Sequence, residues 1–140
     1  MTEFTLHKQL EADTDFITDL PLSRALLIND SQYPWIVLVP RRVGATEIYK
    51  LSTDDQTQLL DESAQVCRAM EVLFAPDKMN VAAIGNMVPQ LHLHHVARFR
   101  TDIAWPAPVW GFAQAVTYDA TTLKNTVDRV REALQSVRNS

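Results

Sequence analysis

The sequence predicts an α+β fold with an antiparallel sheet, because its apolar runs of strand length occur in neighbouring pairs. Residues 24–28 and 35–39 are separated by a short polar turn, as are residues 79–84 and 89–98, and this spacing is typical of β-hairpins. The first pair is apolar almost throughout, which indicates a sheet covered on both faces. Strands and helices do not alternate regularly, so a parallel βαβ sheet is not favoured.

The longest helix is expected from Thr53 to about Phe74. Residues 53–56 match a capping box with acidic side chains in the first turn, where the helix dipole favours them. Apolar residues then recur every three or four positions until Pro76 ends the helix. The remaining expected elements are a short helix within 5–13, a strand over 16–20, an irregular loop over 101–111 and a final helix from Asp119 or Thr121.

Length and composition indicate one soluble domain spanning residues 1–140. Apolar residues make up 46% of the chain and charged residues 21%, as in ordinary globular proteins. The net charge of −4 argues against a general surface for nucleic acid or anionic membranes. No apolar stretch approaches the length of a membrane span. An anionic substrate would therefore need a local positive site.

A single cysteine, Cys67, excludes an intramolecular disulfide and fits a reducing compartment. It lies on the apolar stripe of the long helix, which favours a buried structural thiol over a nucleophile. Residues 1–4 contain neither a basic region nor an apolar run, so no secretory signal is visible. The expected location is the cytoplasm.

Three of the four histidines lie within residues 89–98, which we expect to form a strand. Alternation along a strand places Gln90, His92 and His94 on one face and directs His95 to the other. Neighbours on one face are about 6–7 Å apart. This spacing suits groups placed along one phosphoanhydride, or two ligands of one metal ion.

A neutral imidazole attacks phosphorus well and forms a phosphoramidate that water can hydrolyse. His92, central in the motif, is the candidate nucleophile. The turn at Gly85-Asn86 could contribute backbone N–H donors for the phosphate. Arg98 shares the face of His92 and Arg100 continues it, so either phosphate binding or a solvated strand end is compatible with these two arginines.

Other interpretations remain open. His92 and His94 could ligate zinc together, but Cys67 belongs to the helix stripe and His95 should point away, so further ligands are lacking. Two histidines on one strand are, without further information, more often structural than catalytic. Trp105 and Trp110 could stack on a base or pack in a dimer interface, and Asn29 by itself is only a turn residue.

Residues 90–96, Gln-Leu-His-Leu-His-His-Val, resemble the histidine-triad (HIT) signature, and are most similar to short bacterial members in which glutamine replaces the first histidine. Residues 27–30, 35–40, the long helix and residues 80–86 follow the order found in that family. The resemblance therefore covers nearly the whole chain.

The resemblance implies an α+β domain with about five antiparallel strands, paired with a second copy into one dimeric sheet. It implies a partner that is a purine nucleotide or dinucleoside polyphosphate, with His92 forming a covalent nucleotidyl intermediate. His94 would contact the phosphate or the leaving group, Asn29 the ribose, and Gly85 with Asn86 the phosphate. No metal or other cofactor is implied.

Three positions depart from the family pattern. Gln90 can form hydrogen bonds but cannot titrate, Asn86 is shorter than the usual glutamine, and His95 occupies a position that is normally apolar. Two functions consequently remain. One is a hydrolase or transferase that cleaves a phosphoanhydride or phosphoramidate bond, with Gln90, His92 and His94 as catalytic residues and Arg98 binding substrate. The other is a non-catalytic nucleotide-binding or regulatory module.

Overall fold

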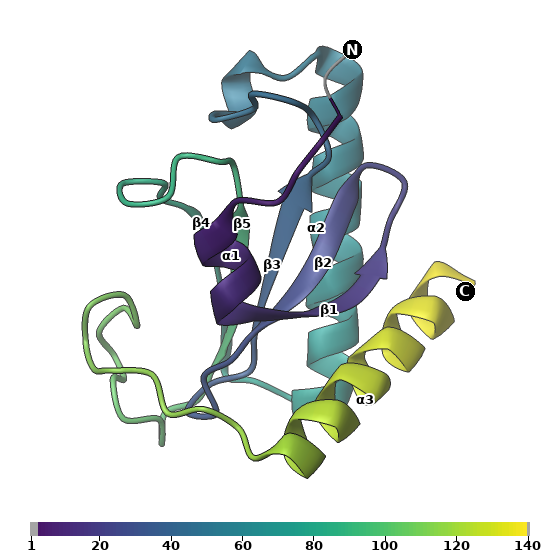
Figure 1. The fold of residues 1–140 in the computed structure, drawn as a ribbon. Coiled ribbons are helices and arrows are strands. Elements are labelled where there is room, and N and C mark those ends of the chain that lie inside the picture. Colours follow the sequence, from purple (N-terminus) through teal and green to yellow (C-terminus); the bar gives the residue numbers. More distant parts are fainter. Residues whose placement is uncertain (1–2, 140) are drawn as a thin grey trace.

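The computed structural model describes residues 3–139, which form a five-stranded antiparallel sheet in the order β1-β2-β3-β5-β4 (Figure 1). The expected α+β fold is confirmed. The elements in chain order are α1 (Lys8–Asp13), β1 (Thr14–Asp19), β2 (Ser23–Ile28), β3 (Trp35–Pro40), the 3₁₀ helix η1 (Ile48–Lys50), α2 (Thr53–Phe74), β4 (Lys78–Ala83), β5 (Leu93–Arg98) and α3 (Ala120–Arg138). The prediction that no secretory signal is present concerned residues 1–4, of which Met1 and Thr2 lie outside the described residues.

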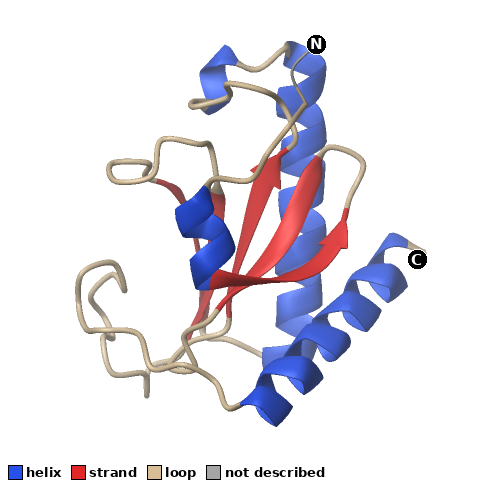
Figure 2. Cartoon of the chain, in the orientation of Figure 1, coloured by secondary structure: helices blue, strands red, loops and turns tan. Residues whose placement is uncertain are grey.

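The two long helices, α2 and α3, pack on one face of the sheet, and α1 crosses the other (Figures 1 and 2). The main core lies between the sheet and the long helices and includes Ile17, Leu38, Met70 and Leu134. On the opposite face, a smaller cluster gathers the N-terminal segment and α1 against β2 and β3. Both faces are therefore covered, as the continuous apolar strands indicate.

The ends of the long helices are set by side-chain caps. The α2 helix is capped by Ser52, whose Oγ accepts a hydrogen bond from the backbone N–H of Asp55 at 3.1 Å. The expected cap at Thr53 is thus one residue too late, because Ser52 supplies the same hydroxyl acceptor with an extended backbone. Asp119 caps α3 as expected, accepting from the N–H of Thr122 at 2.8 Å.

The histidine strand is shorter than expected and begins at Leu93 rather than at residue 89. Pro89 has no N–H to donate, and the N–H of Leu91 donates to the carbonyl of Ala45 instead of to a neighbouring strand. His92 therefore lies in the loop just before β5. Within β5 the alternation holds, since His94 pairs with Val37 of β3 while His95 pairs with Ile36.

The carboxylate of Glu62 fixes α2 to the turn between β1 and β2. This fully buried side chain accepts hydrogen bonds from the N–H groups of Leu22 and Ser23, at 2.7 and 3.0 Å. Gln58, one turn earlier on α2, donates to the same carboxylate at 2.9 Å. Charged acceptors make stronger hydrogen bonds to backbone donors than neutral ones, so this contact sets the position of α2 beneath the sheet. No helix within residues 3–139 combines the length and apolarity required to cross a bilayer.

Candidate active site

His92 and His94 meet in an edge-to-face contact at the entrance to β5. Their ring centroids are 4.8 Å apart and the ring planes are inclined by 69°. Both residues lie mostly below the surface, with 8% of His92 and 6% of His94 exposed. The indoles of Trp35 and Trp110 adjoin His94, with centroid distances of 5.7 and 5.3 Å. The two histidines thus lie in an aromatic environment on the sheet face opposite α2.

The hydrogen bond of His92 determines where its proton lies. Its Nδ1 is 2.7 Å from the carbonyl oxygen of Gln90. A carbonyl oxygen only accepts, so Nδ1 carries the hydrogen and donates it. In the neutral ring, Nε2 then keeps an unshared electron pair, which is the atom required of a nucleophile or general base.

His94 has the opposite arrangement. The indole N–H of Trp35 donates to Nδ1 of His94 at 3.0 Å. Because an indole nitrogen only donates, Nδ1 of His94 is the acceptor and the hydrogen of the neutral ring lies on Nε2. Burial, followed by the charges of His92 and His95, lowers the pKa of His94 from 6.5 to about 3. His94 is therefore a neutral hydrogen-bond donor at physiological pH.

His95 lies on the helix-covered face, as strand alternation predicts. Its Nδ1 is 3.3 Å from the carbonyl oxygen of Ile36 and donates to it. Its Nε2 is 2.8 Å from Oγ of Ser63 on α2 and accepts the hydroxyl hydrogen. Burial lowers the pKa of His95 from 6.5 to about 4. This third imidazole joins β5 to α2 and takes no part in the pair formed by His92 and His94.

The side-chain amide of Gln90 binds the N-terminal segment. Its Oε1 accepts from the N–H of His7 at 2.7 Å, and its Nε2 donates to the carbonyl of Thr5 at 2.9 Å. Only the main-chain carbonyl of Gln90 contacts His92. The expected catalytic role of the Gln90 amide does not match this placement. The alternation of side chains along a strand could not predict these hydrogen bonds, because Thr5 and His7 lie more than 80 positions before Gln90 in the chain.

Arg98 is a buried structural residue, with 2% of its surface exposed. Its guanidinium donates to both carboxylate oxygens of Asp102, at 2.9 and 3.1 Å. It also donates at 2.8 Å to Oδ1 of Asn80 and to the carbonyl of Ala107. Neither of the two expected roles fits, since Arg98 is buried rather than at a solvated strand end and four of its five N–H donors are engaged within the protein. Arg100 is exposed and lies beyond β5.

Asp102 organises the loop that follows β5. Besides Arg98, it accepts hydrogen bonds from the N–H groups of Phe99, Ala104 and Trp105, at 2.8–3.1 Å. Trp105 lies over the guanidinium of Arg98 at 5.7 Å, whereas Trp110 reaches His94. The sequence does not distinguish the roles of Trp105 and Trp110, but the structure does: of these two, Trp110 contacts His94 and Trp105 packs on Arg98.

The other predicted binding residues lie at the end of β2 and in the loop between β4 and β5. Oδ1 of Asn29 accepts from the N–H of Tyr118 at 2.9 Å and ties the chain before α3 to the end of β2. Gly85 has φ +70°, a conformation that favours glycine, in the loop between β4 and β5. Asn86 is exposed in the same loop. Among the described residues, no hydrogen bond joins Asn29, Gly85 or Asn86 to His92 or His94.

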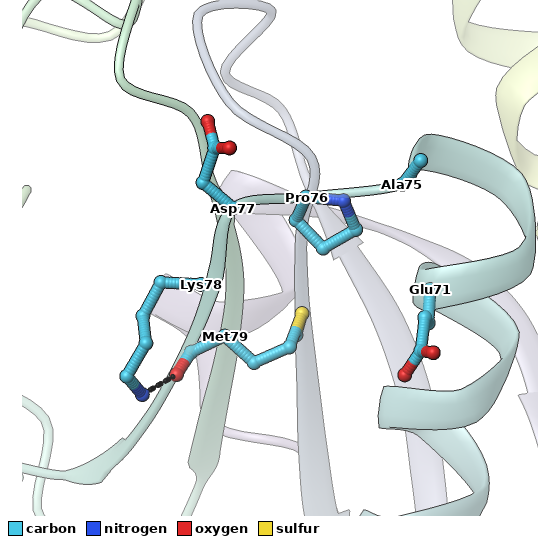
Figure 3. A pocket seen from close by; sticks show the side chains of 6 residues that line it. All are labelled: Glu71, Ala75, Pro76, Asp77, Lys78 and Met79. Carbon is cyan, nitrogen blue, oxygen red and sulfur yellow. Dashed lines mark hydrogen bonds between the residues drawn. The ribbon is translucent and has the colours of Figure 1, made fainter.

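Two hollows lie elsewhere on the described surface. One of about 550 Å³ lies at the end of α2, where Lys78 donates to the carbonyl of Met79 at 2.7 Å (Figure 3). Another of about 390 Å³ lies between the N-terminal segment and strands β1 and β2. Neither hollow is lined by His92 or His94. The histidine site is therefore defined by the contact between the two rings and by their hydrogen bonds. Among residues 3–139, no cluster of three His, Cys, Asp or Glu side chains is arranged to hold a metal ion.

The buried, neutral state of His95 predicts a pH dependence of stability. Its pKa falls from 6.5 to about 4 on folding, so between these values the unfolded chain binds more protons. The free energy of unfolding should therefore decrease as the pH falls from about 6.5 towards 4. Replacing His95→Val should flatten this slope by up to about 1.4 kcal/mol per pH unit. Urea unfolding at several pH values measures it, and parallel slopes for the two proteins would contradict the assignment.

Comparison with known proteins places this chain in a family. The family model described as the HIT domain matches residues 9–101. A histidine triad protein from Bradyrhizobium japonicum is 47% identical, with a TM-score of 0.92, covering 95% of this chain and 99% of that one. One from Marinobacter aquaeolei VT8 is 45% identical, with a TM-score of 0.93 and coverage of 97% and 99%.

A third solved structure, a histidine triad protein from Sinorhizobium meliloti 1021, is 37% identical with a TM-score of 0.91, and the alignment covers 93% of this chain and 96% of that one. No functionally curated protein matches the chain. The matched domain spans well over half of the residues, and the three structures agree in fold over nearly their whole length. The chain belongs to the HIT domain family.

Proposed function

We propose that this protein is a HIT-type nucleotide hydrolase or transferase acting through a covalent nucleotidyl-histidine. Its substrate would be a purine nucleotide with a phosphoanhydride or phosphoramidate bond, a class that includes dinucleoside polyphosphates. The observation that carries the proposal is the pair of opposite tautomers on two rings whose centroids are 4.8 Å apart: Nε2 of His92 has no hydrogen, whereas Nε2 of His94 has one. A hypothetical histidine triad nucleotide-binding protein from Sulfolobus tokodaii has the same fold, with a TM-score of 0.68 and 15% identity.

The first step would form a bond between Nε2 of His92 and the α-phosphorus, while the bond from phosphorus to the leaving oxygen or nitrogen breaks and its electron pair departs with the leaving group. The ring of the intermediate becomes positively charged and keeps its hydrogen on Nδ1. That charge strengthens the hydrogen bond to the carbonyl of Gln90, at 2.7 Å in the free protein. Because this positive charge already develops as the N–P bond forms, the Gln90 main chain would stabilise the transition state more than the starting state, which is the condition for catalysis.

In the second step, water or another acceptor would attack phosphorus and lose a proton to solvent, while the electron pair of the N–P bond returns to Nε2 of His92. The N–H of His94 would donate to a phosphoryl oxygen in both steps, or to the leaving oxygen or nitrogen in the first step, without bringing a charge of its own. Asn29 remains proposed for the ribose, and Gly85 with Asn86 for the phosphate. We do not propose Arg98 for substrate binding, because the residue is buried and four of its five N–H donors are engaged by Asp102, Asn80 and Ala107.

The second candidate is a non-catalytic nucleotide-binding module, and the position of Gln90 favours it. A histidine there would offer a titratable group, whereas the Gln90 amide is neutral and bound to Thr5 and His7. If no other group protonates the leaving group, cleavage would be slow and binding would be the function. This candidate predicts saturable nucleotide binding without hydrolysis. We further infer a cytoplasmic location and no nucleic-acid partner.

We also propose a homodimer formed through β4. This strand is at the edge of the sheet and pairs with β5 on one side only. Its Val81 is 47% exposed, an apolar residue on an edge that monomeric proteins usually protect with charges. Pairing β4 with the same strand of a second copy would satisfy its free backbone groups and extend the sheet across the dimer.

The catalytic proposal predicts that His92→Asn abolishes turnover. Nucleoside phosphoramidates and dinucleoside polyphosphates should be cleaved by the native protein, and a protein–nucleotide adduct should be trapped by rapid acid-free quenching and intact-mass spectrometry. The variant should lose at least about a thousandfold in kcat and form no adduct, because Asn supplies no nucleophilic nitrogen. Circular dichroism and nucleotide binding check that it remains folded. Full activity in His92→Asn would refute the mechanism, and binding without hydrolysis by the native protein would favour the module.

The dimer proposal predicts that Val81→Lys shifts the native protein towards monomer in sedimentation equilibrium. Two copies of the new charge would face each other across the paired edges. Gln135→Lys is the matched control, because it adds the same charge at an exposed position on α3, which packs against β1 at the opposite side of the sheet. A native monomer, or a dimer unaffected by Val81→Lys, would contradict an interface at β4.

A further inference from the structure

We propose that Trp35 is a positioning residue of the histidine site, which fixes His94 as a donor at Nε2. The indole of Trp35 would act through His94 rather than by touching the reacting atoms. The inference rests on the proposed function for its catalytic meaning. Its structural part, the proton position on His94, can be measured without any substrate.

The indole is held in place before it meets the histidine. Trp35 is the first residue of β3 and pairs with Val96 on β5. Tyr33 packs edge-on against its ring at a centroid distance of 6.2 Å, and Trp110 does so at 6.0 Å. Two roughly perpendicular contacts from separate segments restrict the indole to one orientation. Its N–H therefore points at Nδ1 of His94, 3.0 Å away, through packing rather than by chance.

The fixed indole excludes the other tautomer of His94. If the hydrogen were on Nδ1, two N–H groups would face each other and neither would have an acceptor. In a largely buried contact that arrangement is strongly disfavoured. With the indole donor in place, Nε2 bears the hydrogen and His94 can donate to a phosphoryl oxygen. With the other tautomer, Nε2 would present a lone pair to that oxygen and repel it.

Trp110 provides a natural comparison. Its ring contacts the same histidine at 5.3 Å, and the two planes are inclined by 72°. Its indole nitrogen is buried and has no hydrogen-bond partner among the described residues. Trp110 therefore packs on His94 without a hydrogen bond to either nitrogen of the imidazole. Replacing Trp110 removes packing alone, whereas replacing Trp35 removes both packing and the N–H donor to Nδ1 of His94.

The first test is ¹⁵N-detected NMR of the imidazole nitrogens near neutral pH. The native protein should show His94 as one tautomer, with the hydrogen on Nε2, and a through-hydrogen-bond coupling between Trp35 Nε1 and His94 Nδ1. Trp35→Phe keeps an aromatic ring without the donor and should give a mixture of tautomers, while Trp110→Phe should keep the native pattern. A native His94 with its hydrogen on Nδ1, or an unchanged pattern in Trp35→Phe, would overturn the assignment. The native coupling decides the matter even if the variant does not fold.

The second test is kinetic. Trp35→Phe should lower kcat in proportion to the fraction of His94 that the NMR measurement finds with its hydrogen on Nδ1, about twofold for an equal mixture, and change KM less, since that fraction presents the wrong tautomer to the transition state. A changed tautomer with unchanged kcat would overturn the positioning role. A native protein that turns over no nucleotide would instead overturn the proposed function, and with it the catalytic part of this inference, while the NMR result would still decide the tautomer.

Discussion

The hydrogen bond from Nδ1 of His92 to the carbonyl of Gln90 is the contact on which the site depends. It is a local bond, two residues apart in the chain, and 2.7 Å long. It assigns the single N–H hydrogen of the neutral ring to Nδ1 and leaves Nε2 with an unshared electron pair. It also gives the ring a partner when Nε2 becomes bonded to phosphorus. A histidine without this acceptor would divide between two tautomers, and only one of them could attack.

The surrounding fold holds this short segment from several directions. Leu91 donates its N–H to Ala45, and the side chain of Gln90 binds the N-terminal segment through Thr5 and His7. Further along β5, the buried pair of Arg98 and Asp102 fixes the loop that brings Trp110 to His94. Breaking a buried ion pair leaves an uncompensated charge, so these two residues make that loop costly to displace. The chemistry proposed for two rings thus relies on contacts that span most of the chain.

Rules that depend on sequence neighbours predicted the features of the fold that involve residues close together in the chain. Period-two alternation placed His95 on the face opposite His94, and the periodicity of residues 53–74 gave the long helix with its correct end. The resemblance in residues 90–96 supplied the family, which the comparisons confirm. Local rules failed where a distant segment provides the partner. The ion pair of Arg98 could not be predicted, because its partners Asp102 and Ala107 come from a loop with no regular pattern. The partners of the Gln90 amide, Thr5 and His7, lie near the N-terminus, far from Gln90 in the chain.

The role of Trp35 could not be predicted for the same reason, because its hydrogen bond to His94 joins residues 59 positions apart in the chain. Nothing in residues 35–39 distinguishes this tryptophan from an ordinary buried strand residue. A sequence can therefore identify which histidines are candidates, because their spacing is local. It does not show which nitrogen of each ring carries the proton, because that depends on neighbours brought together only by the fold.

The most direct measurement is a crystal structure of the protein with a purine 5′-mononucleotide bound. We expect the phosphorus to lie about 3–3.5 Å from Nε2 of His92, in line for attack. Nδ1 of His92 should still donate its hydrogen bond to the Gln90 carbonyl, and the N–H at Nε2 of His94 should donate to a phosphoryl oxygen. A nucleotide whose phosphate lies beyond reach of Nε2, or a His92 ring turned so that Nε2 faces the protein, would contradict it.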